Sequence, residues 1–273
     1  MGMLAQTQSP SVQSGVTFNW EDIQDINDNG DISNGENNLP ATIESIQIGA
    51  TLYNTFVVPS NYQLTRLGPE GHDDNGIRQN GMDVIGTSIT ATLDITDNNA
   101  WDSAAIRAFQ DRNLNHYFTS SDNGANFCAP IDFDAAATTN AQKQTIFYNP
   151  AIPSNADGVL AVTERGGNNC FYVEVYGVPQ GGGPEQKLGE TFVRTGGNLQ
   201  GGAFNPPTPG SDYWESGREI DNGQSVAIAL FTLDNLAPVG SLISRIEFVG
   251  ASQDHGDGKF FLLQTYALDQ TQI

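Results

Sequence analysis

The strongest evidence for the fold class is the stretch G-V-L-A-V-T-E-R-G-G-N-N-C-F-Y-V-E-V-Y-G, which covers residues Gly158–Gly177. Two runs rich in β-branched and aromatic residues, Gly158–Glu164 and Cys170–Gly177, flank a segment of glycines and asparagines. Such runs favour strands and such a segment favours a turn, so we predict a hairpin here. The partial alternation of Phe171–Tyr176 is typical of a strand with one wet face.

Similar runs recur along the chain between Gly, Asn, Asp and Pro residues, and Asp221-Asn222-Gly223 predicts a second hairpin turn. The other predicted strands are Ala41–Gly49, Leu52–Val58, Asp83–Ile95, Gln144–Tyr148, Lys187–Arg194, Gln224–Thr232, Ser241–Val249 and Lys259–Leu268. An apolar stripe predicts a helix over Asn99–Asn113, and a short helix is expected at Trp20–Asp25. We therefore expect an all-β protein, a β-sandwich of jelly-roll type with one or two short helices in its loops.

Charge and composition exclude several classes of partner. The chain has 273 residues with 32 acidic and 11 basic side chains, which gives a formal net charge of −21. Nucleic acid and anionic membranes both require a cationic surface, so we expect neither as a partner, and no apolar stretch is long enough for membrane insertion. Length and pattern predict a polar N-terminal tail over residues 1–15 and a single β-sandwich domain over residues 16–273.

The most specific motif is D-I-N-D-N-G-D-I-S-N-G-E at Asp25–Glu36, which matches the calcium-loop pattern D-x-[DN]-x-[DN]-G-x5-E. Hard Ca²⁺ prefers six to eight oxygen ligands on a flexible loop, and Gly30 allows the sharp turn. The predicted Ca²⁺ ligands are Asp25, Asn27, Asn29, Asp31 and Glu36. Because Leu39-Pro40 and a predicted strand follow, this loop resembles the single EF-hand-like loops of secreted proteins, and the alternative is a turn that binds nothing.

Cys128 and Cys170 are the only cysteines, and no metal-binding spacing accompanies them. One structural disulfide between them indicates an oxidising compartment, so we expect a secreted or cell-surface protein. Two buried free thiols in a cytosolic protein are the alternative.

A candidate ligand site lies in Asp212–Arg218, where aromatic and charged residues stand together. Tyr213 or Trp214 would stack on a sugar ring, and Asp212 and Arg218 would hydrogen-bond its hydroxyls. The alternative is that Trp214 belongs to the core. No catalytic motif is present, so we expect no enzymatic activity, although paired carboxylates of the glycosidase type remain open. The candidates for such a pair are Glu164, Glu174, Glu215, Glu219 and Glu247.

Two segments near the C-terminal end carry a resemblance, I-S-R-I-E-F-V-G at Ile243–Gly250 and D-G-K-F-F-L-L-Q-T-Y at Asp257–Tyr266. They resemble the closing strands of secreted jelly-roll modules in adhesin-like cell-surface proteins of Bacteroidetes-type bacteria. The resemblance implies a surface-exposed β-sandwich that often carries structural calcium and sometimes binds glycan.

These observations favour an extracellular, calcium-stabilised β-sandwich that acts in adhesion or carbohydrate binding, with a glycan or cell-surface ligand as its partner. The second hypothesis is a self-assembling structural protein, such as a capsid, filament or surface-layer subunit, that associates through its N-terminal tail. A glycoside hydrolase or lyase is the third.

Overall fold

The structure is a computed structural model that describes residues 10–21, 42–66, 76–79, 83–86, 108–114, 116–119, 142–195, 205–220, 224–250 and 257–265. Its strands are β1 Val16–Trp20, β2 Ile43–Ile48, β3 Thr51–Tyr53, β4 Thr55–Phe56, β5 Asn61–Arg66, β6 Gly76–Gln79, β7 Asp83–Gly86, β8 Tyr117–Thr119, β9 Gln142–Pro153, β10 Gly158–Arg165, β11 Phe171–Val178, β12 Gln186–Val193, β13 Tyr213–Ile220, β14 Gln224–Thr232, β15 Leu242–Gly250 and β16 Asp257–Gln264. The helix α3 spans Leu233–Leu236, and Ala108–Gln110 are also helical. No helix in these ranges is long and apolar enough to cross a membrane.

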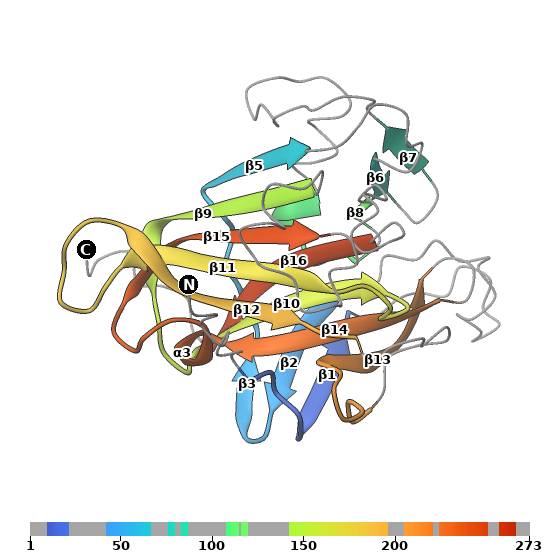
Figure 1. The fold of residues 1–273 in the computed structure, drawn as a ribbon. Helices are drawn as coiled ribbons and strands as arrows, with labels where there is room; N and C mark the ends of the chain where they lie inside the picture. The colour runs from blue at the N-terminus through green and yellow to red at the C-terminus, as the bar shows by residue number, and fades with distance from the viewer. Residues whose placement is uncertain are drawn as a thin grey trace, which may run out of the picture.

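Two antiparallel sheets form the sandwich (Figure 1). One has the order β12-β11-β15-β9-β5, and the other contains β13-β14-β10-β16 with β4 paired to β16. Eight of these strands form the layers β4-β16-β10-β14 and β9-β15-β11-β12. When these eight strands are followed in chain order, each one lies in the other layer from the one before it, except that β11 and β12 share a layer. This arrangement is a jelly roll, so the predicted all-β sandwich is confirmed.

The β4-β16-β10-β14 layer, here called the central sheet, is buried on both faces. Its inner face packs against the β9-β15-β11-β12 layer through alternating side chains such as Leu160, Ala229 and Phe260. Its outer face packs against a third, small sheet of order β1-β2-β3 through the intervening residues, such as Ala161 and Ile228. All eight residues of β10 are therefore buried, which explains why its sequence is a continuous rather than an alternating apolar run.

The predicted hairpin at Gly158–Gly177 is wrong, because its two strands belong to different layers. β10 pairs with β14 and β16, whereas β11 pairs with β12 and β15. Gly166 and Gly167 have φ values of 81° and 66°, and they turn the chain from one sheet to the other. Turn residues specify a change of direction, and the partner of each strand depends on contacts distant in the sequence.

Other predictions from the sequence have mixed outcomes. β14 has the predicted bounds and pairs with β13 with Ile220 opposite Gln224, which confirms the second hairpin. The short helix expected at Trp20–Asp25 is wrong at Trp20, because this residue ends strand β1. Of the predicted helix Asn99–Asn113, residues 99–107 lie outside the described residues, and the helical part ends at Gln110.

Candidate functional site

The predicted calcium loop lies in the connection between the paired strands β1 and β2. The described ends of this connection meet, because the N–H of Glu21 donates to the carbonyl of Thr42 at 3.0 Å. Arg112 also joins them, with an ion pair to Glu21 at 3.5 Å and a hydrogen bond to the carbonyl of Glu44 at 3.0 Å. The five predicted Ca²⁺ ligands Asp25, Asn27, Asn29, Asp31 and Glu36 lie outside the described residues, so the Ca²⁺ site stays a prediction. The described residues contain no cluster of three or more His, Cys, Asp or Glu side chains suited to a metal.

The disulfide prediction has one described partner. Cys170 is buried just before β11, where its Sγ accepts a hydrogen bond from the N–H of Thr195 at 3.4 Å, and it is not a free thiol. Cys128 lies outside the described residues, so its pairing with Cys170 stays a prediction.

The predicted sugar site at Asp212–Arg218 needs a correction, since its aromatic side chains are buried. Tyr213 is fully buried and its hydroxyl donates to the carbonyl of Asn169 at 2.8 Å. Trp214 is 2% exposed and Asp212 is 0% exposed. A sugar ring stacks only on an exposed aromatic face, so these residues offer no such platform, and Trp214 fits the alternative of a core residue. Arg218 lies in β13, and its side chain is outside the described part of the structure.

A different surface has the features of a ligand site, on the face of the β1-β2-β3 sheet that points away from the central sheet. It is an open pocket of about 660 Å³, which we call the β1–β3 groove. Its lining residues are Phe18, Asn19, Trp20, Glu44, Ser45, Gln47, Leu52 and Asn54. Strand register explains this set, because Asn19 stands opposite Ser45 and Gln47 stands opposite Leu52.

The side chains of the groove combine apolar and hydrogen-bonding character. Leu52 is 43% exposed on the outward face, whereas Phe18 and Trp20 are half-buried and their side chains pack against the core under the sheet. The amide of Asn19 donates to the hydroxyl of Ser45 at 2.9 Å, while Gln47 is exposed and donates to the carbonyl of Gly49 at 3.0 Å. This groove was not predicted from the sequence, although the alternation V-T-F-N-W at Val16–Trp20 is a strand signal that separates Asn19 from the core-facing Phe18 and Trp20.

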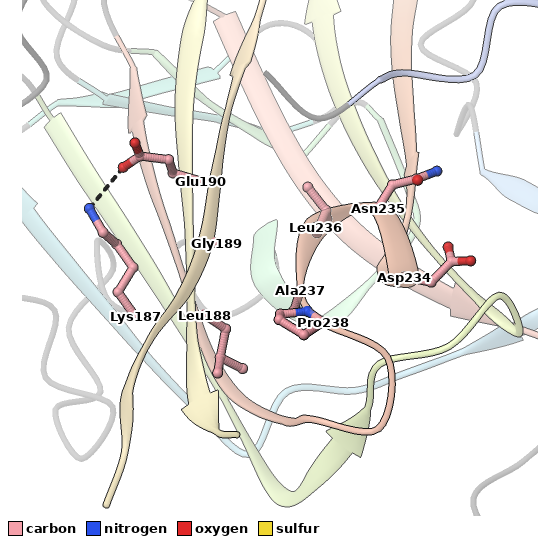
Figure 2. Close-up of a pocket in the computed structure, with 9 residues that line it drawn as sticks. All are labelled: Lys187, Leu188, Gly189, Glu190, Asp234, Asn235, Leu236, Ala237 and Pro238. Atoms are coloured by element: carbon pink, nitrogen blue, oxygen red, sulfur yellow. Dashed lines mark hydrogen bonds and ion pairs between the residues drawn. The ribbon is translucent and has the colours of Figure 1, made fainter. Parts of the chain in front are cut away.

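A second pocket, of about 440 Å³, lies between β12 and α3 (Figure 2). The backbones approach closely here, because a Cβ on Gly189 would stand 2.0 Å from the carbonyl oxygen of Leu236. On the side of β12 away from α3, the Lys187 Nζ contacts Glu190 at 2.8 Å and Glu174 at 3.1 Å. Partial burial alone would lower the pKa of Lys187, but these hydrogen bonds raise it above its ordinary value. Two of the three charged residues that line this pocket, Lys187 and Glu190, thus pair with each other.

Two of the candidate glycosidase carboxylates are neighbours across strands. Glu174 of β11 stands opposite Glu247 of β15 and also opposite Glu190 of β12. Each of the first two has a cationic partner, Lys187 for Glu174 and Arg245 for Glu247. The hydroxyl of Tyr176 donates to Glu174 at 2.8 Å, and partial burial together with this carboxylate raises the pKa of the tyrosine. The strands thus place a carboxylate pair on one face of the sheet.

Comparison with known proteins identifies no family. No family model matches the chain, and no curated protein matches it. A solved structure of the CBM22-1 and GH10 modules of an endo-1,4-β-D-xylanase from Clostridium thermocellum, complexed with xylohexaose, aligns with 7% sequence identity and a TM-score of 0.23. The alignment covers 54% of this chain and 24% of that chain, so this chain spans about a quarter of its length. At this level the likeness supports no function, and the resemblance to adhesin-like modules stays a prediction.

Proposed function

We propose that this protein is a non-catalytic, secreted or cell-surface β-sandwich that binds a neutral carbohydrate in the β1–β3 groove. The observation that carries the proposal is a hollow over the outward face of the β1-β2-β3 sheet, in which the exposed Leu52 lies among the amide side chains of Asn19, Gln47 and Asn54. Leu52 supplies the apolar part, and Gln47 stands opposite it on β2. Phe18 and Trp20 alternate with Asn19 along β1, and their side chains pack against the core on the other face of the sheet.

Sugars need this combination because each pyranose ring presents apolar C–H faces bordered by hydroxyl groups. The exposed side chain of Leu52 can cover such a C–H face. Amide side chains both donate and accept hydrogen bonds, so Gln47 and Asn54 can satisfy hydroxyls in either sense. A groove open to solvent on a sheet face also accepts a chain that is longer than the pocket.

Charge narrows the ligand class. The only charged side chain in the groove is the exposed Glu44, and the protein carries a net charge of −21. Polyanionic glycans are repelled by such a field, whereas neutral glycans are not. Glu44 can accept hydrogen bonds from a pair of sugar hydroxyls.

Calcium enters the proposal through the β1–β2 connection. This connection starts at Glu21, directly after the last residue of β1. An ion bound at Asp25–Glu36 would therefore stabilise the strands that carry the groove. With Ca²⁺ at a hundred times its Kd, linkage stabilises the fold by about 2.7 kcal/mol. Chelation should therefore lower the melting temperature of the wild type, and Glu36→Gln should remove this difference. An unchanged melting temperature would refute the calcium part alone.

The experiment that tests glycan binding uses an array of neutral plant and bacterial glycans, followed by calorimetry with the best ligand. Gln47 and Asn54 are both exposed, so Gln47→Ala with Asn54→Ala should leave the melting temperature unchanged. Each lost hydrogen bond contributes about 1 kcal/mol, so the double variant should weaken binding about tenfold or more.

The matched control is Gln63→Ala, which should leave binding unchanged. Gln63 is also exposed, but it lies on β5 in the β12-β11-β15-β9-β5 sheet, outside the groove. The proposal fails if the wild type binds no glycan on the array. It also fails if the Gln47→Ala and Asn54→Ala substitutions leave the affinity intact.

A glycoside hydrolase is the competing function, because Glu174 and Glu247 are neighbours across strands, as a pair of catalytic carboxylates would have to be. We favour a structural role for this pair, because Lys187 and Arg245 already neutralise it. Turnover of a chromogenic glycoside that is abolished by Glu174→Gln, with the fold intact, would decide for the enzyme.

A further inference from the structure

Residues 10–15, here called the N-terminal strap, lie against β13 and β14 of their own chain. The N–H of Val12 donates to the carbonyl of Leu230 at 2.9 Å, and the carbonyl of Val12 accepts a hydrogen bond from the indole N–H of Trp214 at 2.7 Å. The side chain of Val12 packs against the apolar cluster on the outer face of the central sheet. Both backbone groups of one residue are thus bonded, together with its side chain.

The strap bonds to β14 just beyond the end of the pairing between β13 and β14. The last paired residues are Tyr213 and Ala229, and Leu230 is the next residue of β14. Asp212, which precedes β13, turns away and bonds through its N–H to the carbonyl of Arg194 at 3.0 Å. An incompletely paired strand edge is a ready template for an added segment, and in this protein the strap is that segment.

The site that receives the strap, here called the socket, consists of Ser211, Asp212, Trp214 and Leu230. Asp212 is 0% exposed and accepts a hydrogen bond from the Ser11 hydroxyl. The guanidinium of Arg194 also holds this carboxylate, at 2.9 Å from Nε and 2.8 Å from Nη2. Hydrogen bonds to Asp212 raise the pKa of Arg194, against the smaller opposing effect of burial.

The buried carboxylate of the socket and the start of β13 are held by contacts that do not involve the strap. The Arg194–Asp212 pair and the bond from Tyr213 to Asn169 involve no strap residue. A carboxylate that retains its arginine does not become an unpaired buried charge when Ser11 leaves. The acceptor for Ser11 is therefore held in place for any copy of the strap, and not only for the one attached to it.

Only Ser14 and Gly15 separate the docked part of the strap from β1. Gly15 has a φ of 72°, a left-handed value that glycine adopts without strain. Its carbonyl accepts a hydrogen bond from the N–H of Gly49 at 2.8 Å, which anchors the start of β1. These two exposed residues form the hinge about which the strap can open.

We propose that the socket also accepts the strap of a second copy of this chain, which gives a dimer by reciprocal exchange of residues 10–13. Every strap contact is equally available within one chain or between two, so concentration and hinge geometry set the balance. Because the hinge is short, the two copies must touch, which favours a closed pair over a filament. The dimer does not depend on the proposed carbohydrate binding.

The experiment changes the hinge and leaves the strap and the socket intact. In Gly15→Val the closed hinge becomes strained, because β-branched residues rarely adopt a φ of 72°, whereas an opened hinge is free to change φ. The strain should raise the dimer association constant about tenfold or more. The measurement is light scattering after size-exclusion chromatography across a range of concentrations.

The matched control is Gly182→Val, since Gly182 has a φ of 77° in the turn between β11 and β12 and an added Cβ there meets open space. It introduces similar strain and should remain as monomeric as the wild type. Adding Val12→Asp to Gly15→Val should abolish the dimer, because a carboxylate cannot replace the apolar contact of the strap.

Three results would overturn the proposal. The first is a folded Gly15→Val protein, by circular dichroism, that stays monomeric at all concentrations. The second is a Gly15→Val dimer that survives Val12→Asp, which would place the interface elsewhere. If Gly15→Val does not fold, a synthetic peptide of residues 8–15 is titrated against full-length Val12→Asp, and a lack of binding to the vacated socket would be the third.

Discussion

The two faces of the central sheet are both buried, yet among the described residues only the outer face holds buried cationic side chains. The inner face meets a second large sheet, and its cluster is apolar and rich in aromatic rings, with Phe260 4.6 Å from Phe248 and 6.4 Å from Phe109 between ring centroids. The outer face is apolar where the β1-β2-β3 sheet covers it, but the buried Thr163, Arg165 and Lys259 follow on the same face. The covering elements therefore decide which side chains a buried face can hold.

The charged end of the outer face depends on the segment 108–117. Lys259 is 1% exposed, and its Nζ lies 2.6 Å from Oδ1 of Asp111 and 2.7 Å from the carbonyl of Asn113. The other carboxylate oxygen of Asp111 lies 2.5 Å from Nδ1 of His116. Burial lowers the pKa of Lys259, and Asp111 opposes this effect. A sheet can bury lysine here because another segment supplies both acceptors.

The largest effect should come from the inner face. Phe260→Ala removes a ring that contacts Phe109 and Phe248 in a fully packed layer, so we expect a loss of about 3–5 kcal/mol in the free energy of unfolding. Urea denaturation followed by circular dichroism measures this loss. A loss below about 1 kcal/mol, the level of an ordinary surface change, would contradict close packing between the two sheets.

A somewhat smaller loss should follow from Asp111→Ala on the outer face. Removing the carboxylate leaves the Lys259 ammonium buried with one fewer acceptor, which should cost about 3 kcal/mol because Asp111 itself is partly solvated. Adding Lys259→Met should recover much of the loss, since an apolar chain of similar length replaces the charge. If the double variant is no more stable than Asp111→Ala, the buried charge is not the cause.

The two faces also differ in how much of their structure could be predicted from the sequence. The all-β class and the bounds of β14 were predictable because continuous apolar runs between turn residues specify strands locally. The burial of Lys259 was not, since its acceptor Asp111 lies 148 residues away in the sequence. Trp214 was misassigned for the same reason, because its indole bonds to Val12, 202 residues away. The groove also depends on the pairing of β1 with β2, which no local pattern specifies.

Acid should destabilise the charged end in a pH window set by Asp111. Burial alone would raise its pKa, but Lys259 and His116 together lower it below the ordinary value. A carboxyl group with a depressed pKa in the folded state contributes stability above its unfolded pKa of about 3.9, and this contribution is lost as pH falls through the folded pKa. The difference in stability between wild type and Asp111→Ala should therefore shrink below about pH 4. A constant difference down to pH 2 would contradict the ion pair.

The smallest effect compares the two faces with the same chemical change. Ile46 of β2 and Ile246 of β15 are both 0% exposed, so Ile46→Val and Ile246→Val should each lower the free energy of unfolding by about 1 kcal/mol.

The measurements are calorimetric melting and native-state hydrogen exchange of β1, β2 and β3. If the third layer unfolds together with the sandwich, both variants shift the same single transition by similar amounts. If it opens separately, Ile46→Val leaves the main transition in place and speeds exchange only in β1, β2 and β3. We expect the single transition, because Ile46 packs in one cluster with Val159, Ile228 and Phe261 of the central sheet.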